Sequence, residues 1–172
     1  HYIDKGYSEA EVSSSTVVSE DGVKITFKIV EGKQVVVKKI AFEGNKVVSE
    51  KTLKGQLKLK EIGLFSNGAF QDVSITADSK AIISYYQNRG YVDIKVLNVR
   101  QESSFNEEKN RQELTITFEI QEGSMYDFGG VTFVGNKEFT TEKLLSLVKL
   151  KSGDLYKETK WQESKAAIQN LY

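Results

Sequence analysis

A pair of segments that occurs twice constrains the fold of this 172-residue chain more than any other feature. The sequence VKITFKIVEG at 23–32 is followed by IAFEGN at 40–45, and LTITFEIQEG at 114–123 is followed by VTFVGN at 131–136. The Glu-Gly pairs that end the long segments and the Gly-Asn pairs that end the short ones both recur 91 positions apart. A constant separation of similar segments predicts tandem repeats of one structural unit.

Each long segment alternates apolar and polar residues, as in Leu114, Ile116, Phe118 and Ile120 of the second copy. A period of two places the apolar set on one face of a β-strand. Burying each such side chain contributes about 1.5–3 kcal/mol, so that face is expected to be covered by a second layer. The short segment predicts another strand, ended by a Gly-Asn turn because both residues tolerate positive φ.

Helical signals lie between the short and the long segments. Ser49 is a good N-cap for a helix that turns Leu53 and Leu57 inward, and a second helix is predicted over 73–88, ended by Gly90. Between them, residues 60–70 predict a loop with anchoring aromatic residues.

The same order begins again after Gly123, with Thr140 or Thr141 as helix N-cap and a second helix from Trp161. In that helix Ser-Lys-Ala at 164–166 matches 79–81, which places Tyr172 level with Gln87.

The predicted unit is therefore strand, helix, helix, strand, strand, an α+β fold with a three-stranded mixed sheet covered by two helices. The last two strands, 91–100 and 114–120, are expected to form a hairpin across a polar loop at 101–112. Strand 114–120 is expected at the centre, which leaves 91–100 and 36–42 as edges.

The domain organisation follows from the repeat. Residues 33–124 are predicted to be one complete unit, 1–32 the C-terminal part of a preceding unit, and 125–172 the N-terminal part of the next. The chain is therefore expected to be a piece of something longer. Because each partial unit supplies what the other lacks, we also expect 125–172 of one molecule to pair head-to-tail with 1–32 of another.

Composition argues against several function classes. Twenty-four basic and 24 acidic residues give no net charge, whereas a nucleic-acid-binding chain usually has a basic excess. Cysteine is absent and His1 is the sole histidine, so no catalytic residues, metal ligands or cofactor are predicted. Gly129, Gly130 and Gly135 do not fit a phosphate-binding loop.

Three motifs in this order resemble polypeptide-transport-associated (POTRA) domains of the Omp85-type family. They are the Phe-x-Gly-Asn turn at 42–45 and 133–136, Tyr-Tyr-Gln-Asn-Arg-Gly-Tyr at 85–91, and the Ile-x-Glu-Gly strand end. The complete unit looks most like a third POTRA domain of the branch that assembles outer-membrane β-barrels, and 126–172 like the start of a fourth. A transporter arm of the TamA or two-partner secretion type is the alternative.

The resemblance implies a periplasmic part of an outer-membrane protein that is not an enzyme. It also implies a C-terminal membrane β-barrel in the full-length protein, and binding of unfolded outer-membrane proteins and of partner lipoproteins.

The candidate binding site follows from the predicted sheet. An edge strand exposes a row of N–H and C=O groups to which an extended segment can add. We expect this at the proline- and glycine-free segment Val92, Asp93, Ile94, Lys95, Val96, Leu97, Asn98 and Val99.

Three other interpretations stay open. In the first, Asp93, Lys95 and Arg100 are charges that protect the edge. In the second, Tyr126, Tyr156 and Trp161 stack on sugars of the cell wall, which makes the chain a wall-binding spacer. In the third, the helix pair carries an apolar groove, although its apolar residues, Leu53, Leu57, Ile82 and Tyr86, are expected to be core.

Overall fold

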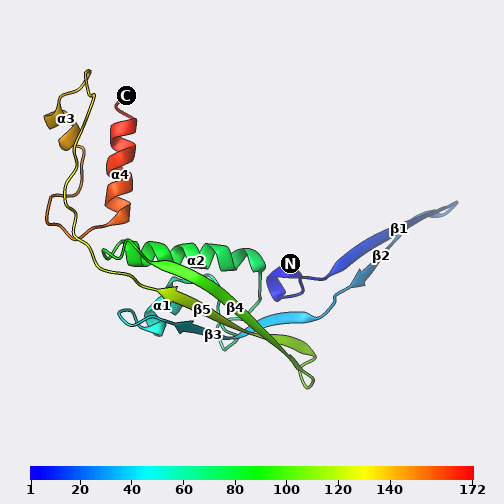
Figure 1. The fold of residues 1–172 in the computed structure, drawn as a ribbon. Coiled ribbons are helices and arrows are strands. Elements are labelled where there is room, and N and C mark those ends of the chain that lie inside the picture. Colours follow the sequence, from blue (N-terminus) through cyan, green and yellow to red (C-terminus); the bar gives the residue numbers. More distant parts are fainter.

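The elements follow the predicted order in a computed structural model that describes all 172 residues (Figure 1). A short 3₁₀ turn, η1, precedes two strands, and the complete unit and the start of the next one follow. The elements are η1 (Ile3–Lys5), β1 (Glu11–Ser19), β2 (Gly22–Val30), β3 (Gln34–Glu43), α1 (Glu50–Gln56), α2 (Asp72–Gln87), β4 (Lys95–Asn106), β5 (Arg111–Gln121), α3 (Thr141–Leu145) and α4 (Glu158–Gln169).

The three-stranded sheet has the order β3-β5-β4, with β5 parallel to β3 and antiparallel to β4. This confirms the mixed sheet and the central third strand. Phe118 of β5 lies opposite Phe42 of β3, and their rings stack with centroids 5.5 Å apart. The long crossover through α1 and α2 allows β3 and β5 to run parallel.

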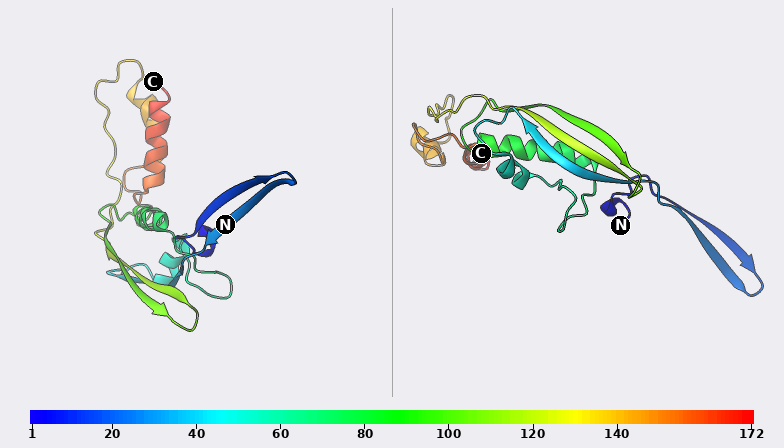
Figure 2. Two further views of the ribbon diagram at one scale, coloured as in Figure 1. Left: turned by 90° about the vertical axis from the view of Figure 1, so that its right-hand side faces the viewer. Right: turned by 90° about the horizontal axis from the view of Figure 1, so that it is seen from below.

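The core lies between this sheet and the two helices, which cover one of its faces (Figures 1 and 2). Ile40, Ile116 and Phe118 from the strands meet Leu53 of α1 and Ile82 of α2, and all are buried. Ser49 caps α1 by accepting a hydrogen bond from the backbone N–H of Thr52, as predicted. The apolar residues of the helix pair are therefore core and do not line a groove.

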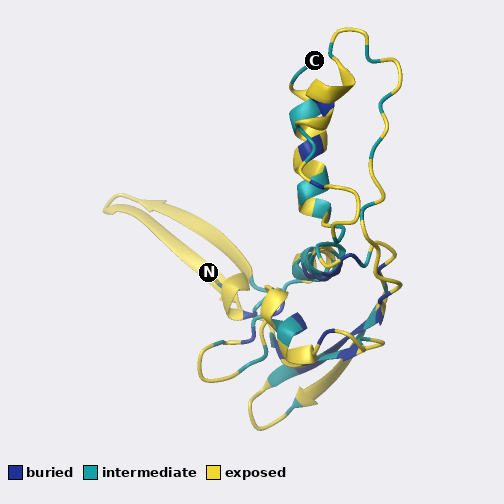
Figure 3. Ribbon diagram, turned by 90° about the vertical axis from the view of Figure 1, so that its left-hand side faces the viewer, coloured by how far each residue is buried: buried dark blue, intermediate teal, exposed yellow.

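Strands β1 and β2 form a separate two-stranded hairpin that extends away from the rest of the molecule (Figures 1 and 3). Its apolar face, which includes Ile25, Phe27 and Ile29, is exposed along its whole length. The expected head-to-tail pairing of this face with 125–172 of another molecule stays a prediction.

Residues 125–172 carry two helices and no strand, so the strand predicted at 131–133 is wrong for this structure. In the complete unit the equivalent β3 obtains its ladder from β5, whereas 131–133 has no such strand beside it. Thr140 caps α3 through the N–H of Lys143, as predicted. None of the helices is both long and apolar enough to cross a membrane.

Two further predictions about boundaries are wrong. Residues 101–106 and 111–112 were expected to be loop but continue β4 and β5, so that the turn holds only 107–110. Their polar side chains can take part in a ladder because one face of the hairpin is open to solvent. Helix α4 begins at Glu158, 86 positions after the start of α2, so Tyr172 matches Tyr86 rather than Gln87.

A buried polar contact fastens the end of α2 to the end of β5. The hydroxyl of Tyr86 donates to Glu122 at 2.6 Å, and the carboxylate also accepts from the N–H of Val47 at 3.0 Å. Burial by itself would raise the pKa of Glu122, but these hydrogen bonds outweigh it and lower that pKa. In the first partial unit, the nearby Glu31 carboxylate raises the pKa of Tyr2, so an equivalent tyrosine and glutamate lie near each other there.

Replacing Tyr86 with phenylalanine is expected to lower the free energy of unfolding by about 1–2 kcal/mol, because a buried carboxylate loses one of its donors. Chemical denaturation monitored by circular dichroism measures the change. Tyr85→Phe is the matched control, since the Tyr85 hydroxyl forms no hydrogen bond and its ring instead lies 3.5 Å from the Arg89 guanidinium. Equal stability of the two variants would contradict this role of the Tyr86–Glu122 contact.

Candidate functional site: the open edge of the sheet

The outer edge of β4 is open. Every backbone hydrogen bond that involves residues 95–106 belongs to the ladder with β5, and none connects the strand to another part of the chain. Most of the strand is exposed to solvent. Because alternate residues of an edge strand direct N–H and C=O groups away from the sheet, β4 offers a row of unpaired groups along its length.

The opposite edge of the sheet, β3, is closed. Val35 and Val37 exchange backbone hydrogen bonds with the segment that leads into α2, namely with Phe70 at 3.3 Å and Gly68 at 2.7 Å. The N–H of Ile40 donates to the carboxylate of Glu61 at 2.7 Å. Of the two edges predicted from the sequence, β3 is therefore occupied over 35–40, and β4 is the one left open along its length.

Three of the eight predicted binding residues lie outside this strand. Val92, Asp93 and Ile94 precede β4 in a turn that follows α2, in which the N–H of Tyr91 donates back to the carbonyl of Tyr86. Ile94 is buried in the core, and Asp93 accepts a hydrogen bond from Tyr126. The backbone here ends the helix and joins the next unit, which the alternation of residue types could not reveal.

The other five predicted binding residues lie on β4: Lys95, Val96, Leu97, Asn98 and Val99. The strand is less regular than expected. The register shifts between Val96 and Asn98, so Leu97 is the extra residue of a β-bulge and is 61% exposed. A bulge disrupts the ladder locally and increases the twist. The regular part of the open edge is therefore 98–106, farther along the chain than the sequence predicted.

The charges on this strand mostly point across the sheet. Arg100 binds Glu119 of β5 and, at 2.7 Å, Glu43 of β3, on the face opposite the helices. Glu113 of β5 likewise pairs with Lys38 and Arg111, both at 2.8 Å, and these hydrogen bonds lower the pKa of its carboxyl to about 2. These ion pairs link the three strands. Of the charges considered for edge protection, Arg100 and Asp93 have partners within the chain, and Lys95 has none.

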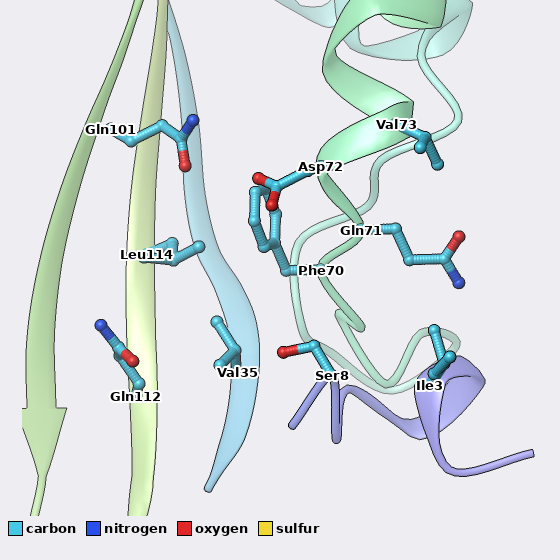
Figure 4. Close-up of a pocket in the computed structure, with 10 residues that line it drawn as sticks. All are labelled: Ile3, Ser8, Val35, Phe70, Gln71, Asp72, Val73, Gln101, Gln112 and Leu114. Carbon is cyan, nitrogen blue, oxygen red and sulfur yellow. The ribbon is translucent and has the colours of Figure 1, made fainter. Parts of the chain in front are cut away.

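A cavity of about 410 Å³ adjoins this edge on the helical side (Figure 4). It opens between the sheet and the first turn of α2, where Gln101 of β4 forms part of its wall. The lining residues are Ile3, Ser8, Val35, Phe70, Gln71, Asp72, Val73, Gln101, Gln112 and Leu114. Half of them are apolar, so the cavity suits an uncharged side chain.

The aromatic residues considered for sugar binding have structural partners. Tyr126 donates to Asp93 at 2.7 Å, Tyr156 donates to Glu158 at 2.6 Å, and Trp161 packs against Phe128. Tyr126 lies at the joint between the two units, and Tyr156 and Trp161 are half-buried in the second one. Tyr126 and Tyr156 lie side by side, since the N–H of Tyr156 donates to the carbonyl of Tyr126 at 3.2 Å, but the hydroxyl of each is bound to a carboxylate.

An equivalent backbone hydrogen bond occurs at each of the two joints between units. The N–H of Tyr126 donates to the carbonyl of Gly90 at 2.8 Å, and the N–H of Val35 donates to that of Gly6 at 2.8 Å. The second joint is reinforced by Asn88 at the end of α2, which accepts from the N–H of Thr159 in the first turn of α4. Residues 85–91 at the end of α2 are therefore connected to the next unit by specific hydrogen bonds.

Comparison with known families identifies the repeat. The model of the POTRA family, described as a surface antigen variable number repeat, matches residues 35–123 and 126–172. The chain belongs to this family. The POTRA resemblance seen in the sequence is thereby confirmed, as is the α+β unit.

The relatives are outer-membrane assembly factors. The chain is 36% identical over 172 residues to a putative outer membrane protein assembly factor of Treponema pallidum, covering all of this chain and 20% of that protein. It is 29% identical over 175 residues to the outer membrane protein assembly factor BamA of Neisseria meningitidis, covering 98% of this chain and 22% of that protein. The chain thus spans about a fifth of the length of these relatives. They agree with the barrel-assembly branch expected from the sequence.

A solved structure shows the same fold. POTRA domains 3–5 of Haemophilus influenzae BamA superpose with a TM-score of 0.59 at 20% identity, covering 99% of this chain and 65% of that one.

Proposed function

We propose that the chain is a periplasmic scaffold of the outer-membrane β-barrel assembly machinery, a binding module rather than an enzyme. It binds unfolded outer-membrane proteins by adding their extended segments to β4, and it also docks partner lipoproteins. The observation that carries this proposal is the contrast between the open edge of β4 and the closed edge of β3. The similarity to BamA proteins supports the setting, including a β-barrel elsewhere in the full-length protein.

Strand addition suits clients of many sequences. The main-chain hydrogen bonds supply affinity without a demand on side chains, and alternate side chains supply selectivity. On β4, Gln101 and Ser103 lie opposite Ile116 and Leu114, which face the helices. An added strand would place every second side chain on this same side, next to the cavity. Clients with alternating apolar residues, as barrel strands have, are therefore favoured.

A client peptide that is N-methylated at alternate residues is expected to distinguish this mode from nonspecific binding. N-methylation removes N–H donors. Methylating the alternate residues whose N–H groups face β4 should therefore abolish binding, whereas methylating those whose N–H groups face solvent should leave the affinity within about twofold. Chemical-shift titration of the labelled chain with the C-terminal strand of an outer-membrane barrel protein measures both. Shifts from the unmodified peptide should concentrate at 98–106.

The comparison between the two methylated peptides contains its own control, since they have the same composition and hydrophobicity. If both bind as the unmodified peptide does, main-chain pairing is excluded. If the unmodified peptide causes no shifts at millimolar concentration, the chain is a spacer or a docking scaffold for subunits. That result would leave the fold and the family unaffected.

A further inference from the structure

The loop between α1 and α2 carries an insertion that the next unit lacks. In both units this loop pairs with the segment that opens the unit. The N–H of Ile62 donates to the carbonyl of Val37 at 2.8 Å, and the N–H of Gly153 donates to that of Phe128 at 2.9 Å. The next bond is also shared, since Val37 donates to Gly68 and Phe128 donates to Asp154, both at 2.7 Å. Residues 153 and 154 are adjacent, whereas 62 and 68 are separated by the five residues 63–67.

This insertion displays the most exposed large apolar side chains of the molecule. Leu64 is 97% exposed and Phe65 is fully exposed. The sequence had predicted that the aromatic residues of this loop anchor it, which is right for the buried Phe70 and wrong for Phe65. Because the next unit forms the two equivalent backbone hydrogen bonds without such residues, those bonds do not require the insertion.

The tip of the loop is held in one conformation. Gly63 donates to the carbonyl of Ser66 at 2.9 Å, so the two exposed side chains sit on a tight turn. The Ser66 hydroxyl accepts from the N–H of Gly68, and the Asn67 amide donates to the carbonyl of Asp4 at 2.9 Å. A preorganised turn loses little conformational entropy on binding, which is a property of interface anchors.

Two charged groups beside the tip are held by bonds to other parts of the chain. Lys60 donates to the carbonyl of Leu57 at 2.6 Å, at the end of α1, and Glu61 binds Lys54 at 2.8 Å. Residues 63–67 carry no charge. Insertion into a membrane surface usually uses an amphipathic helix, whereas 63–66 form a tight turn. An unfolded client would find no unpaired main-chain edge, because Gly63 and Ser66 bond to each other.

We propose that Leu64 and Phe65 form an anchor that inserts into an uncharged apolar cavity on a folded subunit of the same assembly machinery. The choice of partner class rests on the proposed function. The site itself is separate from β4, since the insertion lies on the loop that covers the opposite edge of the sheet, β3. A convex, rigid and neutral pair of side chains requires a concave surface, which a folded protein supplies and an extended chain does not.

Two variants of the complete chain test this proposal. The first deletes 63–67 and joins Ile62 to Gly68, as the next unit joins Gly153 to Asp154. The second, L64S/F65S, keeps the loop length. The matched control is V134S, because Val134 is 93% exposed and lies in the other unit. Thermal unfolding followed by circular dichroism verifies that all three remain folded.

Each purified lipoprotein subunit of the machinery from the same organism is titrated against the wild-type chain and the variants by isothermal calorimetry. We expect at least one subunit to bind the wild type and V134S within twofold of each other, and to bind both tip variants at least tenfold more weakly. The client peptide should still shift 98–106 in all variants, which separates this site from the β4 edge.

Several outcomes would overturn the proposal. They are equal affinity of wild-type and tip variants for every subunit, or binding of no subunit. Sedimentation of the wild type but not the tip variants with phosphatidylethanolamine–phosphatidylglycerol vesicles would reassign the tip to the membrane. A concentration-dependent mass that the tip variants lose would reassign it to a second copy of the chain.

Discussion

Replacing Asp78 with alanine is expected to lower the free energy of unfolding by about 3 kcal/mol, because two backbone N–H groups, one of them buried, lose their acceptor. Asp78 lies in the middle of α2 and is completely buried. Its carboxylate accepts from the N–H of Lys58 at 2.6 Å and from that of Leu59 at 3.0 Å. These two residues follow the end of α1, so the side chain holds the connection between the helices against the core.

The next unit supplies a comparison for this variant. There Ser164 takes the position of Asp78 and accepts from the N–H of Lys149 at 2.8 Å. Asp78→Ser is therefore expected to retain part of the stability, with a loss about half that of the alanine variant. Lys80→Ala, an exposed change on the same helix, should stay within about 0.5 kcal/mol of the wild type. Urea denaturation gives all three values, and a loss below 1 kcal/mol for Asp78→Ala would contradict the role of the carboxylate.

The sequence carries a signal for the burial of Asp78. Asp78 precedes the core residue Ile82 by four positions and therefore lies on the apolar face of the helix. A charged residue on such a face is rarely buried without a partner. Glu113 and Glu122 are buried for the same kind of reason, each with several hydrogen bonds. The donors Lys38 for Glu113 and Tyr86 for Glu122 come from distant parts of the chain, which a single sequence does not connect.

The repeat predicted the order and type of the elements well because the alternation of residue types and the helix caps are local. Whether an edge is open depends on contacts that are not local. The edge of β3 is closed by a loop about 30 residues farther along the chain, and the exposure of Leu64 and Phe65 depends on the length of that loop. The candidate site was therefore predicted only as one of two edges, and its start was placed too early.

Replacing Gly90 with alanine is expected to lower the free energy of unfolding by about 3 kcal/mol and to alter the joint between the two units. Gly90 has φ of +87°, a conformation that costs other residues roughly 1–2 kcal/mol. An added Cβ would also lie 2.9 Å from the carbonyl oxygen of Tyr126 and 2.8 Å from a methyl group of Leu155. The backbone oxygen cannot move without breaking the joint, so the hydrogen bond from Tyr126 to Gly90 should be lost.

The control is a glycine in the unit on the other side of this joint. Gly129 has open space around its Cβ position and is outside the left-handed region, so Gly129→Ala should leave the stability within about 0.5 kcal/mol. Denaturation measures the stability, and residual dipolar couplings measure the orientation of 125–172 relative to 33–124. Gly6→Ala should disturb the first joint in the same way, since its Cβ would lie 2.6 Å from the carbonyl oxygen of Val35. Gly90→Ala could instead show the same stability and the same orientation of 125–172 as Gly129→Ala. In that case the hydrogen bond from Tyr126 to Gly90 does not set the angle between the two units, and the side-chain contacts of Asn88 and Tyr126 must set it.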